Sequence, residues 1–311
     1  MRAVQFAEYG PPSVLRIVEV PQPHAGLGEI RIAVRASSVS PGEVRIRSGA
    51  IREVLPTVFP ARTGYEAAGV VDEVGEGVSG VHVGDEVFGA VPSTDRGANA
   101  DHVVLTVWAR KPAAWTWEEA AGATGAVETS FRVLDRLAVT SGHTVLVQGA
   151  AGGTGSVAVQ LAVVRGATVI GTASEHNHDF LRSLGAEPTT YGPGLVERVR
   201  ALAPSGVNAV FDCAGGALPD LVAIAGDPAR VVTVADITAA AHGVHMSHTS
   251  PSTALGPADP PAVHGLAIAV ELAEQGRLRI PVAGAFPLAE VAAAHALSES
   301  RHARGKIVLL H

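Results

Sequence analysis

Cysteine is almost absent from this sequence, whose 311 residues include only one, Cys213. A single thiol excludes a disulfide within the chain and any zinc site built from several cysteines. Basic residues are also scarce, since 23 lysines and arginines stand against 30 aspartates and glutamates and form no basic run. A nucleic acid is therefore not an expected partner, because its phosphates require a basic surface.

Long apolar runs are absent as well. No stretch approaches the roughly 20 apolar residues that cross a bilayer, so no membrane partner is expected. The first ten residues are typical of a strand and not of a charged segment followed by an apolar one. We therefore expect a cytoplasmic protein. The length suits two domains, each with its own core and with a cleft between them.

The pattern of the sequence changes near Trp117. Before it, short segments such as residues 29–35, 70–74 and 86–88 are bounded by glycine and predict a small, mostly β domain. Residues 29–35 alternate between polar and apolar, which predicts a strand with one buried face. After it, helix-length segments alternate with short apolar strands, which is typical of a parallel sheet covered on both faces. The expected strands are 144–147, 167–172, 207–212 and 230–235, and the expected helices are 156–164 and 179–184. This order predicts a doubly wound nucleotide-binding domain.

The last fifty residues predict two helices, near 265–276 and 288–298, and a terminal strand over 306–310. We assign them to the first domain, which gives boundaries of 1–118, 119–258 and 259–311. Residues 242–261 are rich in Pro, Ser, Ala and His and are expected to form an irregular loop at the domain junction.

A glycine-rich segment, residues 148–155 (QGAAGGTG), follows the first apolar strand of the second part. Small residues allow a tight turn and let backbone amides and a helix N-terminus approach a pyrophosphate. The first position of the usual G-x-G-x-x-G pattern is Ala150. Because a strand precedes the segment, a helix follows it and a second strand comes at the right distance, it indicates a dinucleotide site more than a merely structural turn.

The end of the second strand should decide which dinucleotide binds. An acidic side chain there accepts a hydrogen bond from the ribose 2′-OH of NAD and repels the 2′-phosphate of NADP. Residues 171–174 carry no carboxylate, which favours NADPH; Ser174 can donate to a phosphate, and His176 or His178 adds charge when protonated. Alternatively, Ser174 is an N-cap and Glu175 lies in the first turn of a solvated helix.

Further motifs extend over nearly the whole chain. They are VSPGE at 39–43 with RSG at 47–49, GYEAAGVV at 64–71, VGDEV at 83–87, AAGGTG at 150–155 and GKIVL at 305–309. Together they resemble the medium-chain dehydrogenase/reductase superfamily, in its zinc-independent quinone oxidoreductase (zeta-crystallin-like) branch. The resemblance implies an α/β fold, with a GroES-like, mostly β catalytic domain and a Rossmann doubly wound parallel sheet.

The zinc-dependent alcohol dehydrogenases of that superfamily hold their metal with two cysteines and the His of a G-H-E motif. In this sequence the matching positions offer Ser40 and Tyr65, and no cysteine precedes Cys213. Catalytic zinc needs three protein ligands, so we expect no metal and no alcohol oxidation at a metal. Reduction of a carbon–carbon double bond beside a carbonyl is feasible, because the developing enolate needs only hydrogen-bond donors.

The resemblance also implies the cofactor contacts, along the phosphates, ribose and nicotinamide of NADPH. The expected residues are Ala150, Ala151, Gly152, Gly153, Thr154, Ser174, Tyr191, Gly215, Val234 and Ala235. The candidate catalytic residues are Tyr65, Ser40 and Thr129, the last of which matches a residue close to the nicotinamide in relatives. A homodimer is implied as well.

Several residues allow two interpretations. Tyr65 is a proton donor or a structural hydroxyl, and Glu128 is a buried acid near the nicotinamide or a paired helix residue. Ser40 and Glu43 replace the usual Asn and Asp of relatives, so polar contacts there are expected to be rearranged. His242, His245 and His248 have a spacing that could hold a metal on a helix, but an irregular segment beside the substrate entrance is favoured.

Cys213 and the three tryptophans are better explained by packing. No histidine is placed by the sequence to activate Cys213 as a nucleophile, so a buried small apolar residue is favoured. Trp108, Trp115 and Trp117 could stack on a flat substrate, although anchoring a helix between the domains is favoured.

The leading hypothesis is an NADPH-dependent reductase of a small-molecule quinone or α,β-unsaturated carbonyl compound (enone). Proximity and orientation would carry most of the catalysis. An enoyl-thioester reductase of polyketide or fatty-acid assembly is the enzymatic alternative. A non-catalytic protein that senses NADPH, or binds RNA or a partner, is the alternative from another class, because a fold does not guarantee chemistry.

Overall fold

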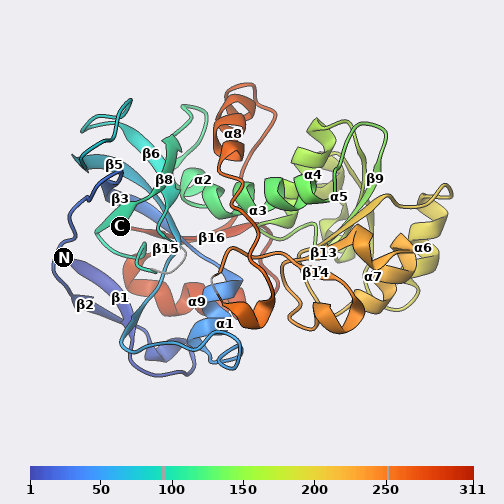
Figure 1. The fold of residues 1–311 in the computed structure, drawn as a ribbon, viewed down its shortest axis with the longest axis horizontal. Coiled ribbons are helices and arrows are strands. Elements are labelled where there is room, and N and C mark those ends of the chain that lie inside the picture. The colour runs from blue at the N-terminus through green and yellow to red at the C-terminus, as the bar shows by residue number, and fades with distance from the viewer. Residues whose placement is uncertain (93–95, 251) are drawn as a thin grey trace. The chain divides into compact units, whose positions relative to one another are not determined.

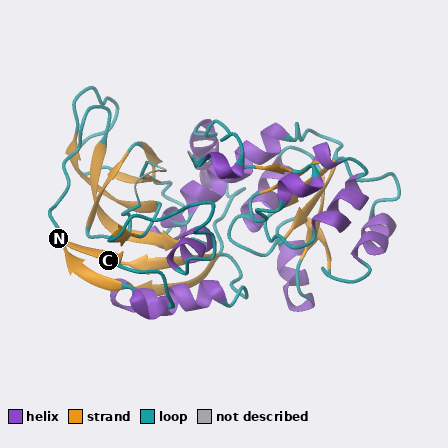
Figure 2. Ribbon diagram, turned by 60° about the horizontal axis from the view of Figure 1, so that its bottom comes forward, coloured by secondary structure: helices purple, strands orange, loops and turns teal. Residues whose placement is uncertain are grey.

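The computed structural model describes residues 1–92, 96–250 and 252–311, which form two compact units. The first unit comprises residues 1–125, 250–254 and 263–311, and the second comprises residues 126–249 and 255–262. The expected α/β fold, with one mostly β unit and one built on a parallel sheet, is confirmed (Figure 2). The domain boundaries after residues 118 and 258 stay predictions.

The first unit is built on two sheets. The larger has the strand order β15-β16-β3-β5-β6-β8, with β7 pairing to β3, and the smaller has the order β2-β1-β4. The strands are β1 (Arg2–Phe6), β2 (Arg16–Glu19), β3 (Ile30–Val39), β4 (Ala61–Arg62), β5 (Glu66–Val74), β6 (Glu86–Ala90), β7 (His102–Leu105), β8 (Val107–Arg110), β15 (Val282–Pro287) and β16 (Lys306–Leu310). Strand β16, which matches the expected terminal strand, pairs antiparallel with β3.

Four helices belong wholly to the first unit, in the part of the chain described. They are α1 (Pro41–Arg47), α2 (Trp117–Ala121), α8 (His264–Glu274) and α9 (Val291–Glu299). The helix α3 (Ala123–Arg136) begins in this unit and continues into the second. The helix expected from residue 288 starts at residue 291, because residues 288–290 form a tighter 3-10 turn.

Strand β3 corrects one expectation. The alternation over residues 29–35 predicts a strand with a single buried face, yet Arg31 is buried too. Its Nε lies 2.9 Å from Oδ1 of Asp72 on the neighbouring strand β5. A paired carboxylate allows a charged side chain to be covered, which polar and apolar alternation alone does not reveal.

The second unit contains six parallel strands in the order β11-β10-β9-β12-β13-β14. The four expected strands appear as β9 (Thr144–Gln148), β10 (Thr168–Thr172), β12 (Ala209–Asp212) and β13 (Val231–Thr233). The sequence pattern did not predict β11 (Ala186–Thr189) or β14 (His245–Met246). Strand β14 lies inside the segment expected to be irregular, and two residues are too few to show a periodic pattern.

Helices cover this sheet on both faces. They are α4 (Gly155–Val164), α5 (His178–Ser183), α6 (Leu195–Leu202) and α7 (Leu218–Ala225), together with most of α3. In Figure 1, α6 and α7 lie next to each other. Their apolar side chains pack on the strands in one core, which includes Leu146, Ile170, Leu195, Val199, Val210, Leu218 and Leu221.

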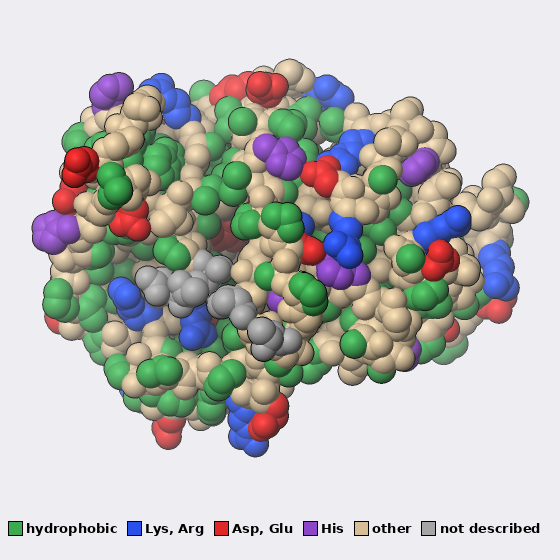
Figure 3. Space-filling view, in the orientation of Figure 1, with side chains coloured by type: hydrophobic (Ala, Val, Ile, Leu, Met, Phe, Trp, Pro, Cys, Tyr) green, Lys and Arg blue, Asp and Glu red, His purple; other side chains and the backbone are tan. Residues whose placement is uncertain are grey.

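The surface is mixed in character. Acidic and basic side chains are interspersed with apolar ones over the face drawn in Figure 3. Among the residues described, no helix is both long and apolar enough to span a membrane.

Candidate functional site

The parallel sheet of the second unit reverses its winding at β9. From β9 the chain passes through α4 to β10 on one side, whereas β12 lies against the other side of β9. In such sheets a crevice forms outside the carboxyl ends of the strands at the reversal, and ligands bind there. The segments that follow β9, β10, β11, β12 and β13 carry all the expected cofactor contacts. The fold thus gathers them at one edge of one sheet.

Backbone N–H groups of the loop between β9 and α4 tie it to the end of β10. Gly149 has a φ of +75°, and its N–H donates to Oγ1 of Thr172 over 3.0 Å. The Ala150 N–H donates to the carbonyl oxygen of Thr172 over 3.0 Å. A Cβ on Gly155 would lie 2.3 Å from the carbonyl oxygen of Gly149, so this close approach requires glycine. The turn leads directly into α4, whose first N–H groups suit a phosphate, and these residues therefore fit a dinucleotide pyrophosphate.

The end of β10 carries hydroxyl groups and no carboxylate. The Ser174 hydroxyl lies 3.2 Å from that of Tyr191, which is 56% exposed, and Ser174 makes no side-chain cap to the turn that follows. Ser174 nevertheless occupies the N-cap position of the 3-10 turn of residues 175–177, and Glu175 lies in the first turn, as the alternative interpretation holds. Glu175 and His176 are exposed. The two hydroxyls can both donate to an anionic group.

Arg198 on α6 is a further polar residue beside this strand end, and the sequence did not predict it. Its guanidinium donates to the carbonyl oxygens of Thr190 over 2.9 Å and Pro193 over 2.8 Å, on either side of Tyr191. It thus holds the turn that presents Tyr191 and brings a positive charge beside it. A helical arginine seven residues after an exposed tyrosine gives no periodic signal, so only the fold reveals the pairing.

The ends of β12 and β13 are tied together by buried Asp212. Its Oδ2 accepts from Thr233 Oγ1 over 2.7 Å, and its Oδ1 accepts from the Gly215 N–H over 2.9 Å. Thr233 Oγ1 in turn accepts from the Ala235 N–H over 3.1 Å. These contacts fix the backbone of Gly215 and Ala235, two of the expected cofactor contacts, at the carboxyl edge of the sheet. Gly215 has a φ of +75°, which suits a residue without a side chain.

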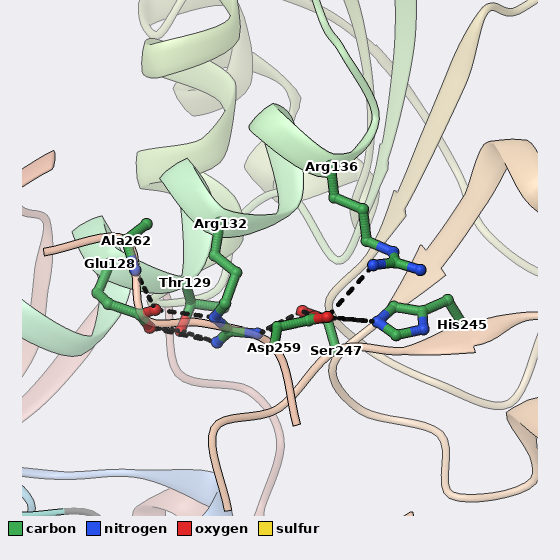
Figure 4. Close-up of polar contacts among 8 residues, drawn as sticks. All are labelled: Glu128, Thr129, Arg132, Arg136, His245, Ser247, Asp259 and Ala262. Carbon is green, nitrogen blue, oxygen red and sulfur yellow. Dashed lines mark hydrogen bonds and ion pairs between the residues drawn. The ribbon is translucent and has the colours of Figure 1, made fainter. Parts of the chain in front are cut away.

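Thr129 on α3 belongs to a buried ionic cluster (Figure 4). We name it the Arg132 cluster; its members are Glu128, Thr129, Arg132, Ser247 and Asp259. Arg132 Nε donates to Glu128 Oε1 over 2.8 Å, and another guanidinium nitrogen donates to Ser247 Oγ. Ser247 Oγ donates to Asp259 Oδ2 over 2.6 Å. Glu128 is therefore a paired helix residue in the structure, as one of its two interpretations holds.

Asp259 has two further polar partners, His245 and Arg136. His245 Nε2 lies 2.9 Å from its Oδ2, and Arg136 Nη1 lies 3.3 Å from its Oδ1. Burial alone would raise the pKa of Asp259, but the hydrogen bonds from Ser247 and His245 hold it below its ordinary value. The aspartate stands between Ser247 and His245, whereas an activated serine needs the histidine next to it, so this trio is not a hydrolytic triad.

The first unit holds Ser40 and Tyr65. Ser40 caps α1, accepting from the Glu43 N–H over 3.3 Å. Burial raises the pKa of Tyr65 to about 12, although the Arg96 guanidinium beside its hydroxyl opposes the rise. Tyr65 is thus a protonated hydroxyl at neutral pH, with a cation as neighbour. This state is compatible with both of its interpretations, as a proton donor and as a structural hydroxyl.

A buried carboxyl, Glu43, lies between these two residues in the chain. Its Oε2 accepts from the Gly64 N–H over 3.1 Å, and its Oε1 lies 3.6 Å from Nε2 of fully buried His295. Burial raises the pKa of Glu43 to about 8, and burial with the nearby Arg47 lowers the pKa of His295 to about 3. The two groups therefore form a neutral pair at pH 7 and not an ion pair.

Glu66 anchors the start of α3. Its Oε1 accepts from Lys306 Nζ over 2.7 Å and from Ser38 Oγ over 2.5 Å, while its Oε2 accepts from the Gly125 N–H over 2.6 Å. A carboxylate at the first turn of a helix is favoured by the helix dipole. This glutamate of the GYEAAGVV motif fixes the helix that carries Thr129.

The histidine segment and Cys213 are the other candidate sites in this unit. Within the part of the chain described, no group of three His, Cys, Asp or Glu residues could hold a metal, and His245 pairs with Asp259. Cys213 is only partly buried, which corrects the expectation of a buried small apolar residue. Burial and Asp212 raise the pKa of its thiol well above the ordinary value, which disfavours the thiolate.

The tryptophans lie in the first unit. Trp115 is buried against Phe88, with 5.4 Å between ring centroids, and Trp117 begins α2 beneath Lys111. Trp108 lies on β8 and packs against the apolar core of the large sheet. Their contacts are those of packed residues.

Two parts of the chain match known protein domain families. Residues 26–141 match the alcohol dehydrogenase GroES-like domain, and residues 184–309 match the zinc-binding dehydrogenase domain. The first match includes Tyr65 and most strands of the larger sheet, and the second includes the segments after β11, β12 and β13.

Individual proteins match over the full length of the chain. A chloroplastic quinone oxidoreductase of Triphysaria versicolor is 32% identical over 99% of this chain and 98% of its own. A chloroplastic NADPH-dependent alkenal/one oxidoreductase of Arabidopsis thaliana is 29% identical over 99% of this chain and 79% of its own. The solved structure of a mycobacterial protein with NADPH superposes with a TM-score of 0.81 and 28% identity, covering 100% of both chains.

Proposed function

Because the chain belongs to the medium-chain dehydrogenase/reductase superfamily, in its quinone oxidoreductase branch, we propose that it reduces a quinone or an enone with NADPH. The resemblance found in the sequence is thus confirmed, and the protein is an NADP-dependent oxidoreductase. The observation that carries the cofactor assignment is the edge of the parallel sheet. There, the loop of residues 149–155 is hydrogen-bonded to the end of β10. That strand end carries hydroxyl groups, lies near an arginine and has no carboxylate over residues 171–174.

The residues of the second unit would hold the cofactor in three parts. The loop of residues 150–154 and the first turn of α4 suit the pyrophosphate. Ser174 and Tyr191, with the charge of Arg198 behind them, suit the 2′-phosphate. Gly215, Val234 and Ala235, held by Asp212 and Thr233, suit the ribose and nicotinamide. When bound, NADPH supplies the hydride for the reduction.

The residues of the first unit would act on the acceptor. Ser40 and Tyr65 stand where zinc-dependent relatives hold metal ligands, and two hydroxyls do not make a zinc site. The Tyr65 hydroxyl keeps its proton at neutral pH and can donate to the carbonyl oxygen of an acceptor. Positive charge from Arg96 favours negative charge developing on that oxygen. This chemistry suits quinones and enones more than alcohols.

A panel of acceptors tests the proposed reaction. Purified protein would be mixed with NADPH and a series of quinones, enones and enoyl thioesters, and absorbance near 340 nm would be followed. Oxidation with quinones or enones preferred is expected. A clear preference for enoyl thioesters would favour assembly-line reduction, and tight binding of NADPH without turnover of any acceptor would favour a sensor.

Substitution at the end of β10 tests cofactor choice. Ser174→Asp introduces the carboxylate that NADPH enzymes lack there, so kcat/KM with NADPH should fall at least tenfold while that with NADH changes little. Ser183→Asp, which introduces the same carboxylate at an exposed position on α5, should leave both values unchanged. If the unaltered enzyme prefers NADH, the interpretation of this strand end is wrong.

Replacement of Tyr65 by Phe tests the proton donor. Loss of a donor that acts in the transition state should lower kcat by about 10- to 100-fold with little change in KM for NADPH. Unchanged turnover would leave Tyr65 a structural hydroxyl.

We further propose that the enzyme works as a cytoplasmic homodimer. Among the residues that the structure describes, the parallel sheet ends at the two-residue strand β14, whose outer edge suits pairing with a second copy. Light scattering after gel filtration should give twice the mass of one chain, and a monomer at micromolar concentration would contradict this.

A further inference from the structure

The hydrogen bonds around the Thr129 hydroxyl give it a defined polarity. A hydroxyl has one proton to donate and two lone pairs that accept. Thr129 Oγ1 donates to Glu128 Oε2 over 3.2 Å and accepts from Arg132 Nη2 over 3.2 Å. The proton and one lone pair are therefore committed, and a second lone pair is left. In this state Thr129 can accept a hydrogen bond from a ligand but cannot donate one.

Two features keep the hydroxyl in this state. An ionised carboxylate only accepts hydrogen bonds and a guanidinium only donates them, so neither neighbour can exchange its role. Arg132 itself is held by several partners: its side chain is 7% exposed and contacts Glu128, Ser247 and Asp259 (Figure 4). Moving it would leave the partly buried Glu128 carboxylate without its cation and take one cation from buried Asp259, which is costly.

The cluster lies at the edge of the sheet where ligands bind. The N–H of Ser247 donates to the carbonyl oxygen of Thr233 over 2.8 Å, and Thr233 ends β13. The segment that carries Asp259 is tied to α3 as well, since the Ala262 N–H donates to Glu128 Oε1 over 3.1 Å. Thr129 is thus connected, within the second unit, to the loops that hold Gly215 and Ala235. Thr129 itself is only half-buried.

We propose that Glu128 and Arg132 are positioning residues that set Thr129 as a hydrogen-bond acceptor for an N–H group of the ligand bound at this edge. For the cofactor of the proposed function, on which this inference rests, that group is the carboxamide NH2 of the nicotinamide. The cluster selects for the amide, because a group without N–H leaves the lone pair unmatched. It also removes Thr129 from the candidate proton donors.

Cofactor analogues test this polarity by binding alone. Calorimetry would compare NADP⁺ with its 3-acetylpyridine analogue, in which a methyl group replaces the carboxamide NH2. The unaltered protein should bind NADP⁺ about tenfold more tightly, as expected for one lost hydrogen bond in a partly buried site. Thr129→Val should reduce this ratio to below about threefold, while Thr140→Val, a matched change at an exposed position, should keep it.

Glu128→Gln separates polarity from packing. The glutamine NH2 can donate to Thr129, which frees the hydroxyl proton for a ligand, so the tenfold preference for NADP⁺ should shrink or reverse in a folded protein. Circular dichroism and the melting temperature would establish folding, and Thr129→Val decides the question if this variant does not fold. A tenfold ratio that persists in Thr129→Val overturns the inference. Failure of the unaltered protein to bind either compound overturns the proposed function itself.

Discussion

The Arg132 cluster of the second unit and the Glu43–His295 pair of the first are both buried, but only the cluster keeps its charges. Arg132 and Asp259 have side chains 7% and 8% exposed, and those of Glu43 and His295 are 1% and 0% exposed. In the cluster, every buried charge has at least one opposite charge and a hydrogen bond. In the pair, Glu43 Oε1 and both ring nitrogens of His295 have no hydrogen-bond partner among the residues described.

The difference shows how available partners decide the protonation of buried groups. A buried charge is retained where opposite charges and donors compensate for lost hydration, as around Asp259. Where they are missing, the group exchanges a proton and becomes neutral, as the raised pKa of Glu43 and the lowered pKa of His295 indicate. Removing a member should therefore be costly in the cluster and mild in the pair.

Loss of the cluster's central cation should have the largest effect. Arg132→Met leaves the side chains of Glu128 and Asp259, which are 17% and 8% exposed, without their shared cation, so unfolding should become easier by about 3–5 kcal/mol. Urea unfolding followed by circular dichroism would measure the change.

Arg136→Met is the matched control for this prediction. Arg136 also contacts Asp259, but its side chain is 47% exposed, so its loss should change the free energy of unfolding by no more than about 1 kcal/mol. Equal effects of the two substitutions would show that burial and pairing do not distinguish the two arginines.

The Glu43 carboxyl should make stability depend on pH. Its folded pKa is about 8, above the ordinary 4.5, so the folded state holds a proton that the unfolded chain releases. Stability from this group is complete below pH 4.5 and is lost as pH rises from 4.5 to 8. His295 acts at lower pH, because its folded pKa of about 3 costs stability as pH falls below 6.5.

Glu43→Gln should flatten the upper part of this dependence. The amide cannot ionise, so the melting temperature should fall less between pH 6 and pH 8.5 than in the unaltered protein. Melting curves over this range would show it, and parallel curves for the two proteins would mean that Glu43 has an ordinary pKa.

The glycine-rich loop and the β10 end could be predicted because their chemistry is local in sequence. Residues 148–155 carry strand, turn and helix start in one segment, and the missing carboxylate at residues 171–174 is visible directly. The Arg132 cluster could not be predicted, because Asp259 lies far from Arg132 in the sequence and falls in a segment without periodicity. The same holds for Lys306 and Glu66, which β3 brings together by pairing with both β5 and β16.

Replacement of His295 should have the smallest effect on the free energy of unfolding. Its imidazole is neutral and both nitrogens lack a partner among the residues described, so His295→Leu removes polar atoms that gain nothing from burial and fills similar space with an apolar group. The free energy of unfolding at pH 7 should change by less than about 1 kcal/mol, in either direction. Urea unfolding would measure it beside Arg132→Met. A loss as large as that of Arg132→Met would mean that His295 is charged and paired with Glu43, and the two buried regions would then not differ.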